Sequence, residues 1–254
     1  MTPGVVGGIV FELASTDSCV AVDLLPDLRA LHATARELPV DVLGPPRVMN
    51  AEAIAAALMA PTVAIPAATR LCRVRNSAGL TRPTRGQLMM SPATLSIPSL
   101  AVGFFIDIGD GSLVVPVSVR SWKPGLRPGD TSHWRARSVA FTAATAHRRY
   151  GGPYHGLRAH LACIALLDRA LELDLAVKVW DWSGYWRDRK SGNLFYLLKA
   201  STAYAAAAAT IVRSVWGSEI SAPSLDAPDH GGDENALEHV YWPDIQALVK
   251  RTGG

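Results

Sequence analysis

The sequence predicts an α+β fold, with an antiparallel, β-rich N-terminal and central part, packed helices, and a C-terminal helix–strand–helix unit. Three observations predict it. Two apolar, β-prone runs flank a glycine-rich turn at residues 109–112, the pattern of a β-hairpin. Residues 154–173 and 194–216 carry apolar side chains at helical spacing. Between these helices, residues 176–180 place Val177 and Val179 on one side of a short strand.

The first fifty residues predict a strand and a helix. The run Val5–Leu13 is apolar and β-prone, and Leu24–Leu38 has leucines at helical spacing. Pro45 and Pro46 are then expected to break the chain, because proline has no N–H to donate. Asn50 is expected to cap a helix over residues 51–60.

A small antiparallel sheet is expected over about residues 100–142. Its strands are Ala101–Ile108, Leu113–Arg120 and a stretch within Ser132–Thr142. Pro116 cannot donate to a ladder, so its strand is expected at an edge or with a bulge. The polar, proline-rich stretch 76–99 that precedes this sheet is expected to be a linker or a long loop.

The chain is expected to form one α+β domain over residues 1–254, because the junction near Gly151 is too short for a free linker. Within it, residues 1–145 form the β-rich part and 151–216 the helical hairpin unit. Residues 217–254 form an irregular tail that ends in a short helix after Trp242. The first long helix is expected to bury one narrow face, made of Leu157, Leu161, Ile164, Leu171 and Leu175.

Composition indicates a globular chain without extracellular or membrane features. Hydrophobic residues make up 49% of the 254, and the formal charge is only +3, so neither disorder nor a dedicated nucleic-acid binder is favoured. Cys19, Cys72 and Cys163 stand far apart, which fits a reducing compartment. We expect no signal peptide, and the sequence has no apolar run of roughly 18 residues. We therefore expect a cytoplasmic protein without a membrane partner.

Two histidines and a cysteine raise the possibility of a metal or a nucleophile. His155 and His160 are five residues apart on the predicted helix, about 140° around its axis, so they cannot share one ion. We expect no metal site, and we expect His160 to be a core residue in a polar network that could include Asp168. Cys163 follows His160 by one turn, but a buried helical cysteine is the ordinary case.

The segment from Trp180 to Arg189 is the first candidate for a binding surface. It concentrates aromatic and charged residues of the kinds found in interface hot spots. The candidate binding residues are Trp180, Asp181, Trp182, Tyr185, Trp186, Arg187 and Arg189, together with His155 and His160. The alternative is a strand-to-helix loop whose aromatic rings cover the core and whose charges pair with each other.

The stretch 155–215 resembles the C-terminal part of a group of uncharacterised bacterial proteins. The matching pieces are Arg158–Asp168, Val177–Arg189 and the alanine-rich helix after Leu197. In that group we expect a loop of the pattern D-E-G-G-Y/F-W-x-x-R. This chain matches it at Asp181, Gly184, Tyr185, Trp186 and Arg189, whereas Trp182 replaces the acidic residue and Ser183 the first glycine. The resemblance implies the layout of the region and no established activity.

Three kinds of function stay open. The first is a non-enzymatic interaction subunit of a bacterial multi-protein system, with a protein partner at residues 180–189. The second is an enzyme of unrecognised type, for which a pocket would have to join at least three of His155, His160, Cys163, Asp168 and Asp181. The third is a nucleic-acid-binding protein that uses Arg73, Arg75, Arg82, Arg85, Arg135, Arg137, Arg148 and Arg149. Because dinucleotide, metalloprotease and serine-hydrolase motifs are missing, we expect no cofactor and name no catalytic residue.

Overall fold

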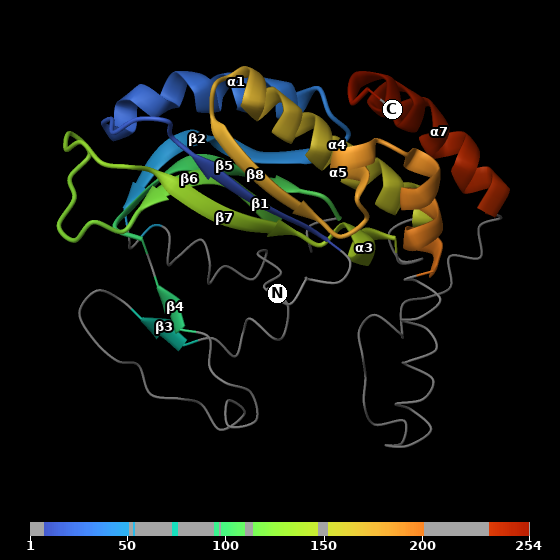
Figure 1. The fold of residues 1–254 in the computed structure, drawn as a ribbon, viewed down its shortest axis with the longest axis horizontal. Coiled ribbons are helices and arrows are strands. Elements are labelled where there is room, and N and C mark those ends of the chain that lie inside the picture. The colour runs from blue at the N-terminus through green and yellow to red at the C-terminus, as the bar shows by residue number, and fades with distance from the viewer. Residues whose placement is uncertain are drawn as a thin grey trace, which may run out of the picture.

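The computed structural model describes residues 8–50, 53, 73–75, 94–96, 98–109, 114–146, 152–200 and 234–253. These residues form an α+β fold, as predicted, with two antiparallel three-stranded sheets and one short parallel pair. The three long helices run along one side of the two sheets (Figure 1). They are α1 (Leu25–Arg36), α4 (Gly152–Glu172) and α7 (Glu234–Arg251).

The first sheet places the first strand of the chain in its centre. Its order is β7–β1–β8, with β1 at Ile9–Ala14, β7 at Arg135–Ala140 and β8 at Ala176–Asp181. Both neighbours are antiparallel to β1, and Ile9 lies opposite Ala140 on one side and Asp181 on the other. Each pairing continues residue for residue without a bulge, so side chains at matched positions share one face.

The second sheet contains the predicted hairpin. Its order is β2–β5–β6, with β2 at Asp41–Asn50, β5 at Leu100–Asp107 and β6 at Val114–Ser121. Strand β6 is an edge strand of this sheet, as Pro116 predicts. The third expected member, β7, instead forms its ladder with β1 and only packs beside β6. Its core-facing alanines lie opposite the bulky alternate residues of β1, which fills the interior without crowding.

The expectation of a chain break at Pro45 and Pro46 was wrong, because strand β2 runs through both prolines. A register shift between Leu43 and Arg47 takes them out of the ladder, and Gly44 adopts a positive φ of 73° at the same point. Because β2 is an edge strand, the missing N–H groups are not needed for a second neighbour.

The predicted helices are present where the structure describes them. Helix α1 follows a 3₁₀ turn, η1 (Ala21–Leu24), and buries Leu28, Leu31, Thr34 and Ala35. Helix α4 is buried on most of its circumference rather than along one narrow face, and Leu171, expected inside, is 45% exposed. Gly156 lets α4 approach α3 (Thr142–Thr145), since a methyl group there would lie 2.6 Å from the Ala146 Cβ.

The C-terminal part differs from the expected tail. Residues 191–200 are helical, with Leu194 and Leu198 fully buried, whereas 201–216 lie outside the described residues. Helix α7 begins at Glu234, well before Trp242, and includes Pro243. Its buried residues, Ile245 and Leu248, join the same core as β1, β5 and α4, which explains why a long helix forms here.

The remaining predictions fall largely on residues that are not described. Asn50 accepts a hydrogen bond from the Ala53 N–H at 2.8 Å, as expected of a helix cap, but most of 51–60 lies outside the description. The stretch expected as a linker contains β4 (Thr94–Ser96), which is parallel to β3 (Arg73–Arg75). No helix in the described part of the chain is long and apolar enough to cross a membrane.

Candidate functional site

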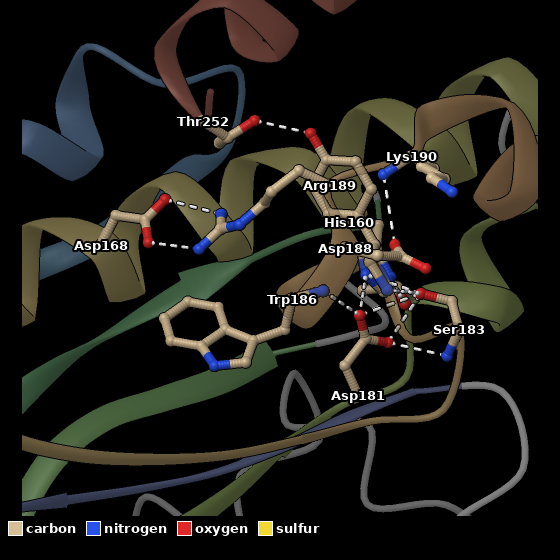
Figure 2. Close-up of polar contacts among 11 residues, drawn as sticks. His160, Asp168, Asp181, Ser183, Trp186, Asp188, Arg189, Lys190 and Thr252 are labelled. Atoms are coloured by element: carbon tan, nitrogen blue, oxygen red, sulfur yellow. Dashed lines mark hydrogen bonds and ion pairs between the residues drawn. The ribbon is translucent and has the colours of Figure 1, made fainter. Parts of the chain in front are cut away.

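The Asp181 carboxylate organises the loop that follows β8. Its Oδ1 accepts hydrogen bonds from the Ser183 N–H at 2.9 Å and the Ser183 hydroxyl at 2.8 Å. Its Oδ2 accepts one from the Trp186 N–H at 2.8 Å (Figure 2). The side chain is only 1% exposed. One acidic side chain at the end of a strand therefore fixes the backbone of the turn into α5 (Tyr185–Asp188).

His160 lies directly beside this carboxylate. Its ring is fully buried on α4, with Nε2 3.4 Å from Asp181 Oδ2 and Nδ1 2.9 Å from the Thr142 hydroxyl. A proton on Nε2 satisfies both contacts, because the ring then donates to the carboxylate and accepts from Thr142. The imidazole thus connects α3, α4 and the end of β8 through one polar network.

This environment keeps Asp181 ionised. Burial by itself would raise the pKa of the carboxyl group. The hydrogen bond and the electrostatic interaction with His160, followed by the bonds from the Trp186 N–H and Ser183, outweigh burial and lower the pKa to about 2. Asp181 is therefore an acceptor at neutral pH, suited to holding donors in place and not to donating a proton.

Ser183, His160 and Asp181 do not form a nucleophile triad. In such a triad the imidazole lies between hydroxyl and carboxylate, and each ring nitrogen serves one of them. Here the Ser183 hydroxyl binds the carboxylate directly, and the same Nε2 faces both groups, 3.5 Å from the hydroxyl. The other nitrogen is held by Thr142. The arrangement shapes the loop and does not activate the serine.

Arg189 and Asp168 form a second, separate contact. Two parallel hydrogen bonds of 2.9 and 2.8 Å join the guanidinium to the carboxylate, and each side chain is about a quarter exposed. The guanidinium also lies 4.7 Å from the ring centre of Trp186. The pair links α4 to the end of the loop, so these charges satisfy each other.

Tyr185 anchors the loop to the end of α7. It is 1% exposed, and its hydroxyl lies 2.7 Å from the hydroxyl of Thr252. Burial raises the pKa of the phenol, and the hydrogen bond with Thr252 partly opposes that rise. The preceding Gly184 has a φ of 77°, a left-handed conformation that a side chain would disfavour.

The predicted binding residues therefore occupy three different environments. Asp181 and Tyr185 are inside the fold, and Trp182, Trp186 and Arg189 are half-buried. Trp180 and Arg187 are exposed, and Trp180 retains 46% of its surface. Since strand residues alternate between faces, Trp180 and Asp181 had to point in opposite directions, a signal that the sequence already contained.

Trp180 belongs to a charged surface on the first sheet, which we call the outer face. Strand register places Arg135, Arg137, Glu12, Lys178 and Trp180 on this face. The Arg137 guanidinium lies 4.9 Å from the Trp180 ring centre. Glu12 lies 3.7 Å from Arg137 and 4.0 Å from Lys178. Sequence reasoning missed Glu12 and Lys178, because their proximity to Trp180 depends on pairing between distant strands.

The other candidate residues are dispersed. His155 Nε2 lies 3.2 Å from the Ile108 carbonyl oxygen, and Nδ1 lies 3.2 Å from Arg158 Nη2. Cys163 is buried in the core, where burial raises the pKa of its thiol to about 12. Only His160 and Asp181 meet, whereas His155, Cys163 and Asp168 have other surroundings. Within the described ranges no three His, Cys, Asp or Glu side chains could hold a metal ion together.

The arginines expected in a nucleic-acid interface are only partly described. Arg135 and Arg137 lie on the outer face, and Arg73 and Arg75 are in β3. The other four, Arg82, Arg85, Arg148 and Arg149, lie outside the described residues. Comparison with protein families, curated proteins and solved structures finds no match to this chain.

Proposed function

We propose that this protein is a cytoplasmic, non-enzymatic interaction subunit of a bacterial multi-protein system, and that a protein partner contacts it around Trp180. The observation that carries the proposal is the indole of Trp180, 46% exposed and stacked on Arg137. Tryptophan and arginine are the residue types that most often dominate interface energetics. Partner binding would bury a large apolar surface that water now covers.

Exposure alone would not single out Trp180, because Trp122 and Trp242 are exposed to 43% and 42%. Its surroundings make the difference. Trp180 projects from a regular strand whose neighbours fix its position, and Arg137 lies against its ring on the outer face. A side chain held in this way loses little conformational entropy when a partner covers it.

The loop after β8 supports the proposal as a rigid base. The carboxylate of Asp181 and the buried ring of Tyr185 fix the loop to α4 and α7, so that Trp180 and Arg187 stay on the surface. The enzyme alternative has no comparable support, because its proposed residues do not share a pocket. For the nucleic-acid alternative, the structure brings Arg135 and Arg137 onto the outer face and places Arg73 and Arg75 in β3, whereas its other four arginines lie outside the described residues.

The test is native mass spectrometry of the tagged protein purified gently from its own host. Trp180→Ala is compared with Trp122→Ala, a matched control in the turn that leads into β7 at Arg135. Arg135 is at one end of β7. Trp180 lies toward the other end of the sheet, because it is opposite Val10, which is itself opposite Val139. We expect wild type and Trp122→Ala to retain another polypeptide, and Trp180→Ala to bind it about 30-fold more weakly or not at all.

Circular dichroism is needed to show that both variants stay folded. Retention of the same polypeptide by Trp180→Ala would contradict a contact at Trp180. A chain that is always recovered alone or as a homo-oligomer would contradict the role of an interaction subunit. Co-purified nucleic acid that is lost in 0.5 M salt, on the order of the ionic strength that screens phosphate contacts, would favour the nucleic-acid alternative instead.

A further inference from the structure

We propose that β8 is a docking edge that takes an extended, acidic segment of the partner protein as the next strand of the first sheet. This presupposes the binding role proposed above and adds the conformation and charge of the partner. Strand addition uses backbone hydrogen bonds for affinity and alternating side chains for specificity.

The geometry of β8 suits an added strand. It pairs with β1 over six consecutive residues without a bulge, and it is the last strand in the order β7–β1–β8. Among the described elements β1 is its only strand neighbour. The backbone of Ala176 to Trp180 therefore presents a regular row of donors and acceptors about 17 Å long on its other side.

The edge strands of the second sheet are built differently. Strand β2 is interrupted by the bulge between Leu43 and Arg47 and contains two prolines. Strand β6 contains Pro116. Prolines and bulges are common devices that prevent an edge from pairing with another chain. Strand β8 has neither device, and Lys178 is its only charge on the outer face.

Lys178 sets the charge of the segment. A lysine on an edge strand commonly serves only to discourage aggregation. Here, however, its ammonium is 71% exposed and lies 4.0 Å from Glu12, which Arg137 also approaches at 3.7 Å. Arg137 keeps Glu12 paired when Lys178 turns toward a carboxylate on the added strand. With Arg135 and Arg137 on the same face, an acidic residue opposite Lys178 meets a net positive surface.

The alternation of β8 also defines the other residues of the segment. Val177 and Val179 face inward and are half-buried, so residues opposite them should be apolar. Acidic and β-branched residues in alternation would satisfy both faces. A second copy of this chain fits less well when centred on Lys178, because the two ammonium groups would lie opposite each other. Pairing of two copies centred on Val179 would keep the two ammonium groups apart, so self-association is also measured, by sedimentation velocity.

The experiment measures binding of a fluorescein-labelled peptide of about seven residues, alternating glutamate and valine, to the full chain by fluorescence anisotropy. We expect saturable binding, and no binding of the lysine–valine peptide. Lys178→Glu should bind the acidic peptide at least about tenfold more weakly, and should acquire binding to the lysine–valine peptide. Lys190→Glu, at an exposed lysine outside β8, should leave both unchanged. Two further acidic peptides, one N-methylated at its odd-numbered residues and one at its even-numbered residues, test backbone pairing. At least one of them should lose binding.

Three results would overturn strand addition: no binding of the acidic peptide, equal binding by wild type and Lys178→Glu, or full binding by both N-methylated peptides. The last would indicate surface attraction without backbone pairing. Sedimentation velocity that shows a wild-type dimer, dispersed by Lys178→Glu, would assign the edge to a second copy. If the peptide fails while a Trp180-dependent complex persists, only strand addition is lost and the binding role stands.

Discussion

Asp181→Asn replaces one carboxylate oxygen with an NH₂ group at the centre of the loop after β8 and removes its buried charge. In the native side chain each oxygen accepts from a backbone N–H, Ser183 at 2.9 Å and Trp186 at 2.8 Å. An amide has a single oxygen, so its NH₂ group must face one of these two donors. Because a backbone N–H cannot turn away, the substitution leaves at least one partly buried donor without an acceptor.

Two estimates, which count some of the same hydrogen bonds, give the size of the effect. Loss of a charge-assisted hydrogen bond with its donor left unpaired costs about 1.5–3 kcal/mol. The lowering of the Asp181 pKa to about 2, from about 3.9 in an unfolded chain, corresponds to about 2–3 kcal/mol. We therefore expect the free energy of unfolding at pH 7 to fall by about 2–4 kcal/mol, a large part of the stability of a typical domain.

Urea unfolding followed by circular dichroism measures this loss. The matched control is Asp188→Asn, at an exposed residue of the same loop that should change stability by less than about 0.5 kcal/mol. The native pKa of Asp181 lies below its unfolded value, so its contribution is complete above about pH 4 and is lost as the pH falls toward 2. The gap between wild type and Asp181→Asn should narrow over that range. An Asp181→Asn variant as stable as Asp188→Asn, or a gap independent of pH, would refute the reasoning.

Two further predictions concern the core. Gly103→Ala would place a methyl carbon 2.3 Å from the Val117 carbonyl oxygen and 2.5 Å from the Ser118 Cβ, so we expect a loss of about 1–3 kcal/mol or more in urea unfolding. Gly129→Ala, with nothing within 4 Å of the added carbon, is the control, and equal stability of the two variants would contradict the close packing of β5 on β6. Burial raises the pKa of Cys163 to about 12, so its thiol stays protonated and enclosed. Iodoacetamide at a pH of about 8, near the ordinary thiol pKa, should modify the partly exposed Cys19 before Cys163 in peptide mapping, and equal labelling would indicate that the core opens readily.

The spacing of apolar residues within single segments was enough to predict several helices and one hairpin. The hairpin of β5 and β6 and helices α1 and α4 follow from apolar spacing within each segment. Strand partners were beyond such reasoning, because the place of β7 beside β1 depends on how two distant segments fill one core. The chain break expected at Pro45 and Pro46 was wrong for the same reason. An edge strand tolerates proline, and only the order of the strands in the sheet shows that β2 is an edge strand.

Composition located the candidate site but could not show which of its residues are exposed and which are buried. Aromatic and charged residues do gather in residues 180–189, yet the structure places Asp181 and Tyr185 inside the fold and half-buries Trp182, Trp186 and Arg189. Trp180 and Arg187 stay exposed. The exposure of Trp180 could have been inferred from the alternation of its strand. Its setting could not, because Glu12 and Arg137 reach it only through the pairing of three strands.

The central position of β1 also constrains the order in which the protein can fold during synthesis. Residues 9–14 are synthesised well before their two neighbours, residues 135–140 and 176–181. An apolar strand must therefore wait, unpaired on both sides, until most of the chain has been translated. Closing such long loops is slow compared with forming helices and hairpins. Until then residues 9–14 expose unpaired strand edges that can aggregate, so a chaperone that shields this strand should raise the yield of folded protein.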